Sequence, residues 1–120
     1  MFNINQDTMA YSDYLVERVR QRLSSSNITE EKKMMGGYVF MVNKKMCVGI
    51  DVDKTTGNDR LMVRVGKIPY KKLLFRKGSR QMDFTGKVMR GFLFINPEGF
   101  DSDEDLDFWI EKALEFNKEI

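Results

Sequence analysis

Few residues of this 120-residue chain have types and spacing that could support chemistry. A glycine pair, Gly36-Gly37, is flanked by lysines and could cradle a phosphate, and Cys47 is the single thiol. The sequence contains no histidine, so it lacks the commonest general base and the commonest transition-metal ligand. Serine–histidine and cysteine–histidine nucleophilic pairs are therefore excluded, as are metal sites built on cysteine and histidine.

The glycine pair has the wrong context for a phosphate loop. Such a loop follows a strand and opens a helix, because the amides at a helix N-terminus supply the anion site. Gly36-Gly37 is instead followed by Tyr-Val-Phe-Met-Val, which has no helical period. Glycines inside a strand pattern more often mark a bulge or the close approach of another backbone. We therefore predict that the pair bends a strand.

The acidic residues before the last helix and the thiol also have structural interpretations. Asp101, Asp103 and Asp105 alternate as in a calcium loop, but the glycine and the final glutamate of such a loop are missing. Helix capping and the helix dipole explain them, so no metal site is predicted. Cys47 lies in an apolar run and is predicted to be buried, a reactive thiolate being the alternative. We predict no catalytic residue and no cofactor.

Hydrophobic periodicity predicts a single α+β domain with the element order α-β-β-β-α-β-β-α. The expected helices lie at 11–23, within 66–78 and within 102–120, and the expected strands at 38–42, 46–52, 61–65 and, as a pair around a turn at 83–86, within 80–95. Short connections between consecutive strands favour a mainly antiparallel sheet with helices packed against it. Several strands are apolar on both faces, so we expect helices or a partner chain to cover both sides.

Residues with special backbone or packing properties are assigned structural roles. Pro69 suits the start of the middle helix, and Trp109 follows the helical spacing of the last one. The nine methionines predict adaptable core packing, with a soft binding face as the alternative if they gather at the surface. The residues assigned structural roles are Gly36, Gly37, Pro69, Gly86, Gly91, Pro97, Gly99 and Trp109.

Charge is strongly segregated along the chain. Residues 67–90, the basic segment, hold eight basic residues against one acidic, a net charge of +7, whereas residues 98–119 hold nine acidic against two basic, a net charge of −7. The interpretation we favour is that the last helix lies beside the basic segment and pairs with it. The alternatives are an acidic protein partner or an anionic ligand, and then nucleic acid. The candidate binding residues are Lys67, Lys71, Lys72, Arg76, Lys77, Arg80, Lys87 and Arg90.

Five segments, taken in order, resemble one known family. They are MAYSDYLVERVR, KKMMGGYVFMVNKKMCVGI, LMVRVG, DFTGKVMRGF and EGFDSDEDLDFWIEKALEF, and they resemble the N-terminal domain of the TfoX/Sxy family from about Met9 to Asn117. The resemblance implies an α+β fold similar to secretion chaperones. Full-length members are regulators of bacterial competence genes that work with a transcription factor and have a second, C-terminal domain. This chain is expected to be a stand-alone copy of the first domain. The family supplies no established catalytic residues.

These observations together predict a non-enzymatic protein-interaction module. One domain is expected over residues 1–120, with 1–8 as a flexible extension. The expected role is transcriptional regulation through a protein partner, with direct binding of nucleic acid or an anionic ligand through the basic segment as the alternative. A homodimer is a further hypothesis, and an enzyme that works without histidine is the least favoured one. The absence of a secretory signal, a membrane-length apolar run and paired cysteines predicts a cytoplasmic protein.

Overall fold

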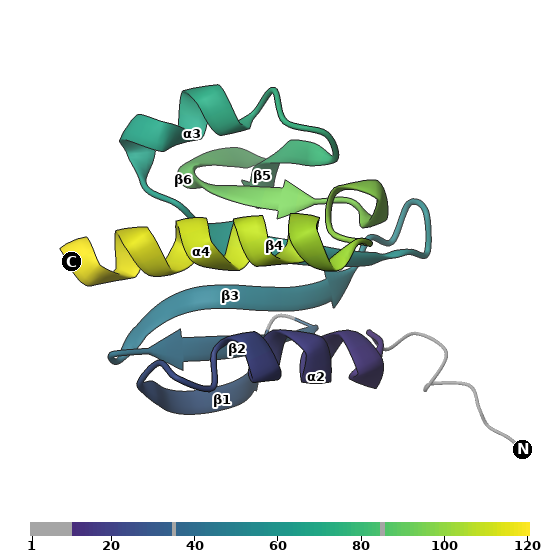
Figure 1. The fold of residues 1–120 in the computed structure, drawn as a ribbon. Coiled ribbons are helices and arrows are strands. Elements are labelled where there is room, and N and C mark those ends of the chain that lie inside the picture. Colours follow the sequence, from purple (N-terminus) through teal and green to yellow (C-terminus); the bar gives the residue numbers. More distant parts are fainter. Residues whose placement is uncertain (1–10, 35, 85) are drawn as a thin grey trace, which may run out of the picture.

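The computed structural model describes residues 11–34, 36–84 and 86–120 (Figure 1). The helices are α2 (Asp13–Arg22), α3 (Lys67–Leu73) and α4 (Asp103–Glu119), and a short 3-10 helix, η1 (Pro97–Gly99), precedes α4. The strands are β1 (Ile28–Met34), β2 (Gly37–Val42), β3 (Lys45–Val52), β4 (Asp59–Arg64), β5 (Ser79–Phe84) and β6 (Lys87–Ile95). The flexible extension predicted at 1–8 lies outside the described residues.

The six strands form one antiparallel sheet in the order β1-β2-β3-β4-β6-β5, which confirms the predicted α+β class. Strand β1 is an addition to the predicted elements. Its sequence, ITEEKKM, is mostly charged and has no apolar alternation, so periodicity does not reveal it. It pairs with β2 from Ile28↔Val42 to Met34↔Gly37. The backbone ladder with β2 therefore places this strand at the edge of the sheet.

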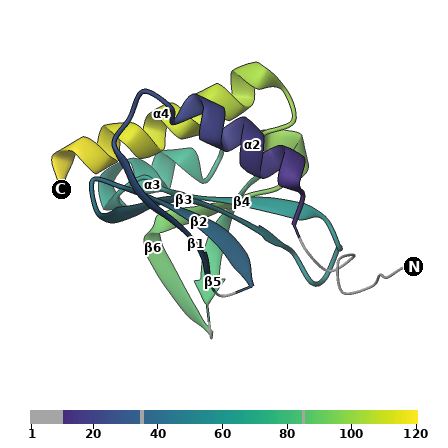
Figure 2. The same cartoon turned by 90° about the horizontal axis from the view of Figure 1, so that it is seen from below.

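The three helices lie on one face of the sheet (Figure 2). Val19 of α2, Tyr70 of α3 and Trp109 of α4 all belong to one buried cluster, which we call the helix-side core. They meet strand residues such as Phe40 and Val63, whose side chains are fully buried. No helix in the described part of the chain is long and apolar enough to cross a membrane.

The opposite side of the sheet, the helix-free face, carries a second apolar cluster. Its buried members are Met62, Met82 and Phe94. Figure 2 shows the β5–β6 hairpin turning away from the helices on this side. We expected helices or a partner chain to cover both faces of the sheet. In the described residues helices cover only one face. On the other face, side chains from neighbouring strands pack against each other and none of the described helices lies over them.

The glycine pair lies between two strands and not at the start of a helix. Gly36 has a φ of 76° in the turn that joins β1 to β2, and Gly37 is the first residue of β2. A Cβ on Gly37 would lie 2.5 Å from the carbonyl oxygen of Ile50, so the neighbouring strand requires glycine here. The pair thus shapes the backbone through a hairpin turn and a close strand contact, where the sequence suggested a bulge.

The other residues assigned structural roles lie at turns and close contacts. Pro97 begins η1, and Gly86 lies in the turn between β5 and β6. Gly91 lies in β6, where its carbonyl accepts hydrogen bonds from the amides of Val65 and Gly66. These contacts anchor the connection between β4 and α3 to the neighbouring strand.

Candidate functional site

Helix α3 is held to the body of the domain by one side only. Pro69 lies in its first turn, and the side chain of Tyr70, only 6% exposed, reaches the helix-side core together with that of Leu73. At its N-terminal end Gly66 has a φ of 88°, and a Cβ there would lie 2.5 Å from the ring of Phe116. The tight approach of α4 fixes the start of α3, so the remaining side of the helix faces outward.

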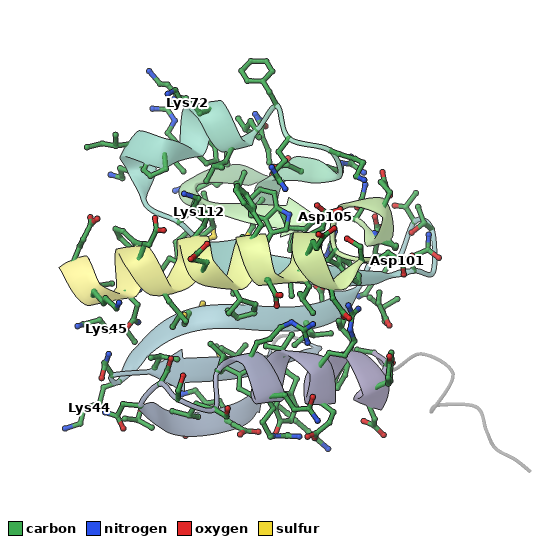
Figure 3. All side chains as sticks on the ribbon, in the orientation of Figure 1. Lys44, Lys45, Lys72, Asp101, Asp105 and Lys112 are labelled. Atoms are coloured by element: carbon green, nitrogen blue, oxygen red, sulfur yellow. The ribbon has the colours of Figure 1, made fainter. Side chains whose placement is uncertain are left out.

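That outward side carries two large apolar side chains between lysines. Ile68, Lys71 and Lys72 lie on the outward side of α3 at i, i+3, i+4 spacing, and Phe75 lies in the turn that follows the helix. Ile68 is 92% exposed and Phe75 is 91% exposed. We call these four residues the α3 surface. Figure 3 shows Lys72 pointing away from the sheet.

The exposure of these two side chains is unusual within this chain. The large hydrophobic residues that are exposed in the described part are Tyr14, Ile68, Phe75, Val88 and Ile120. Isolated exposed apolar residues need no explanation, but an apolar group gathered on one surface suits an interaction site. Lys71 and Lys72 form no salt bridge with any described residue. The α3 surface therefore offers apolar area and positive charge together.

Two candidate residues just after α3 are held by α4. The guanidinium of Arg76 lies 3.2 Å from the Asp105 carboxylate, and the ammonium of Lys77 lies 3.4 Å from it. Arg76 also stacks 3.5 Å above the ring of Phe108. Figure 3 shows Asp105 on the N-terminal half of α4. Arg76 and Lys77 thus attach the segment after α3 to α4, and the expected pairing of opposite charges exists at this point.

Other acidic residues at the start of α4 pair with α2 and not with the basic segment. Asp103 contacts both Arg18 and Arg22, at 3.1 and 2.9 Å, and Asp107 lies 2.6 Å from Arg22. The hydrogen bond from Arg18 and the nearby charge of Arg22 lower the pKa of Asp103. Because α2 supplies these partners, the acidic helix leaves most of the basic segment exposed.

The structure divides the eight candidate binding residues into three groups and does not gather them in one patch. Lys67, Lys71 and Lys72 lie on α3; Arg76 and Lys77 pair with Asp105; Arg80, Lys87 and Arg90 are exposed on the β5–β6 hairpin. The sequence did not identify Ile68 and Phe75 as part of a site. The available signal was that both fall outside the helical stripe of Tyr70, Leu73 and Leu74.

Cys47 and the aspartates at the start of α4, which were considered for chemistry, have structural roles. The Cys47 side chain is 1% exposed, and burial raises the pKa of its thiol to about 12. The thiol is therefore protonated near neutral pH and is a poor nucleophile. Ser102 caps α4 by accepting a hydrogen bond of 3.1 Å from the amide of Asp105, and Asp103 and Asp105 lie in the first turn of that helix. The carboxylates thus complement the positive end of the helix dipole.

The fold is that of a small α+β domain with a six-stranded antiparallel sheet and helices on one face. Its α3 surface is exposed and combines apolar side chains with lysines. The model of the TfoX N-terminal domain family matches residues 21–117. The chain therefore belongs to the TfoX N-terminal domain family, as the ordered sequence segments indicated. No curated protein sequence matches it.

Proposed function

We propose that this domain is a non-enzymatic module that binds a protein partner through the α3 surface. The observation that carries the proposal is the exposure of Ile68 and Phe75, 92% and 91%, beside two lysines. Buried apolar and aromatic anchors supply most of the affinity at protein interfaces. Charges around them steer and orient the partner. The matching partner has an apolar pocket edged by carboxylates.

Membership of the TfoX N-terminal domain family supports a role for this partner in transcriptional regulation, where it would be a transcription factor or a protein bound to one. The non-enzymatic part of the proposal is supported by the absence of histidine from the sequence and by the protonated, buried thiol of Cys47. The homodimer and the cytoplasmic location suggested by the sequence stay predictions.

A second candidate function is direct binding of nucleic acid or another anionic ligand through the basic segment. It is favoured by the exposure of Lys71 and Lys72 on α3 and of Arg80, Lys87 and Arg90 on the β5–β6 hairpin. Such binding rests on contacts with phosphates, so it falls steeply with salt. Apolar side chains at α3 are not needed for those contacts. The two functions therefore respond differently to the loss of Ile68 and Phe75.

The test uses the full chain as bait in a soluble extract of its native cells. The captured protein is identified, purified and titrated against two double variants, Ile68→Ser/Phe75→Ser and Lys71→Glu/Lys72→Glu. Each is expected to weaken binding by at least about 30-fold, which corresponds to about 2 kcal/mol, the size of an interface hot spot. All four residues are exposed, so neither change should disturb the fold.

Two matched controls distinguish specific binding at the α3 surface from non-specific binding by exposed aromatic or charged residues. Tyr14→Ser removes another exposed aromatic ring, and Lys33→Glu/Lys44→Glu makes the same change in charge near the β1 edge of the sheet. Both controls should bind the partner as the wild type does. Equal binding by all variants would refute the proposal. Retention on DNA and heparin that is lost with Lys71→Glu/Lys72→Glu but kept with Ile68→Ser/Phe75→Ser would establish the second function instead.

A further inference from the structure

Four of the methionines that the structure describes gather on one side of the sheet. The helix-side core contains no methionine among its described members. On the helix-free face, Met62 and Met82 are buried, and Met46 and Met89 pack against them. Methionine has a flexible, polarizable side chain that adapts to irregular partners, and it is overused at binding surfaces that accept varied ligands. This grouping therefore marks this face as more adaptable than the core beneath the helices.

Both edges of the sheet meet at one cleft on this face. The cleft has a volume of about 90 Å³ and is lined by Met34 of β1 and by Met82 and Asp83 of β5. Strands β1 and β5 are the first and last in the sheet order, so they can line one cavity only because the sheet curls. Among the described residues each edge strand pairs with one neighbouring strand, so the N–H and C=O groups of its outer side can accept a further strand.

The size of the cleft suits a single side chain. A cavity of about 150 Å³ holds benzene, and pockets for drug-sized molecules measure roughly 300–1,000 Å³. The space here exists partly because Gly49 has no side chain: a Cβ at that position would lie 3.1 Å from Cε of Met62. Gly49 is buried in the middle of β3, where Val39 and Met62 are its neighbours on the adjoining strands.

Among the charged residues that line the cleft itself, one carboxylate is available. Arg60 stacks 3.5 Å above the ring of Phe94 and donates two hydrogen bonds of 3.0 Å to Asp51, so its charge is already compensated. Asp83 is exposed and forms no salt bridge with any residue that the structure describes. The charged groups that line the cleft, Asp51, Arg60 and Asp83, therefore have a net negative charge.

We propose that this cleft binds an extended peptide segment of a partner protein, added along the free edge of β5. One apolar side chain of the peptide enters the cleft between Met34 and Met82, and a basic residue next to it faces Asp83. Strand addition supplies main-chain hydrogen bonds, and a pocket for an inward-pointing side chain supplies selectivity. The site is separate from the α3 surface, because α3 lies on the other face of the sheet.

The test uses capped peptides Thr-Thr-X-Lys-Thr-Thr-Tyr, in which X is Leu, Met, Phe or Thr. They are titrated into the full chain with isotope-labelled methionine methyl groups and followed by NMR. At least one apolar X should shift the methyl signals of Met34, Met62 and Met82, whereas X = Thr should bind at least about 10-fold more weakly, because threonine buries less apolar surface in the cleft. Signals that stay fixed with every apolar X would overturn the proposal.

A charge-swap pair tests the role of Asp83. Asp83→Lys should weaken the binding of the Lys peptide several-fold. It should strengthen the binding of the matched peptide in which Glu replaces Lys. Glu98→Lys makes the same change in net charge at η1 and should leave both affinities unchanged. Equal binding of both peptides by Asp83→Lys would overturn the assignment of the basic residue.

Gly49→Ala and the α3 charge variant provide two further checks. Gly49→Ala narrows the floor of the cleft and should weaken the peptide with X = Phe more than the peptide with X = Leu. Thermal unfolding of this variant verifies that it is folded. If the folded variant binds the peptides with X = Phe and X = Leu in the same ratio as the wild type does, the peptide side chain does not enter this cleft. Lys71→Glu/Lys72→Glu should bind the peptide as the wild type does, so failure here is distinguishable from failure at the α3 surface.

Discussion

At the scale of single residues, a charged network explains how a strand without an apolar pattern is held. The Glu31 carboxylate of β1 accepts hydrogen bonds from Arg20 of α2, at 2.8 Å, and from the hydroxyl of Tyr38 of β2, at 2.7 Å. The hydrogen bond from Arg20 lowers the pKa of Glu31, against the opposing effect of burial. Three elements are thus tied together by one side chain of the edge strand.

We predict that Glu31→Gln lowers the free energy of unfolding by about 1–2 kcal/mol at pH 7, within the range for charge-assisted hydrogen bonds that are partly exposed to water. Because the folded-state pKa of Glu31 lies below its ordinary value of 4.5, its contribution is present above pH 4.5 and is lost as the pH falls through the folded-state pKa. Denaturant unfolding at several pH values measures this.

The control is Glu30→Gln, since Glu30 is exposed on the same strand and lies 3.9 Å from Lys32. It should change stability by less than about 0.5 kcal/mol. A difference between wild type and Glu31→Gln that stays constant from pH 7 to pH 3 would contradict the assigned role of this carboxylate.

At the scale of elements, Gly99 lies where three parts of the chain meet. These are the segment after α3, the 3-10 helix η1 and helix α4. A Cβ on Gly99 would lie 2.6 Å from the carbonyl oxygen of Lys77 and 2.7 Å from Cγ2 of Ile95. The indole of Trp109, which is fully buried, donates a hydrogen bond of 3.1 Å to the carbonyl of Gly99. Gly99 therefore lets the chain after α3 and the last helix approach the same turn.

We predict that Gly99→Ala lowers the free energy of unfolding by about 1–3 kcal/mol, the usual cost of forcing extra volume into a packed site. The adjacent, exposed Glu98→Ala should cost less than about 0.5 kcal/mol. Chemical denaturation compares the two variants, and the tryptophan fluorescence of Trp109 reports on the same region. Equal stability of Gly99→Ala and the wild type would show that the turn can relax around a methyl group.

Elements with strong apolar periods were predictable from the sequence, and those held by other forces were not. The spacing of Leu15, Val16 and Val19 in α2 and of Leu106, Trp109 and Ile110 in α4 is that of one buried helical side, as the structure shows. Strand β1 escaped prediction because its ladder with β2 and its contact with Arg20 are made with residues outside the strand itself. The hydrophobic periodicity of a segment indicates which of its residues are buried, but it does not indicate which other segment the strand pairs with.

The candidate site was predictable only in part, for a similar reason. Lys71 and Lys72 stood out because charge is visible in the sequence. Which basic residues are compensated depends on tertiary contacts: Arg76 and Lys77 meet Asp105, whereas Asp103 and Asp107 meet arginines of α2. Ile68 and Phe75 are apolar, and their exposure follows from the orientation of α3, which the sequence does not give.

At the scale of the whole molecule, the sheet separates two proposed binding surfaces. The α3 surface lies with the helices, and the methionine-lined cleft lies on the helix-free face. The helix-side core joins residues from all three helices to the central strands, so a partner bound at α3 need not deform the cleft. We therefore predict that the two proposed surfaces bind their partners independently of each other.

Hydrogen exchange of the purified complex between this domain and the captured partner tests whether the α3 surface binds that partner. We predict slower exchange of the backbone amides of residues 67–75 in the complex, with the strands β2, β3 and β4 unchanged, because the contact covers α3 without altering the core. Unchanged exchange at 67–75, with protection elsewhere on the domain, would contradict the claim that the α3 surface binds the partner.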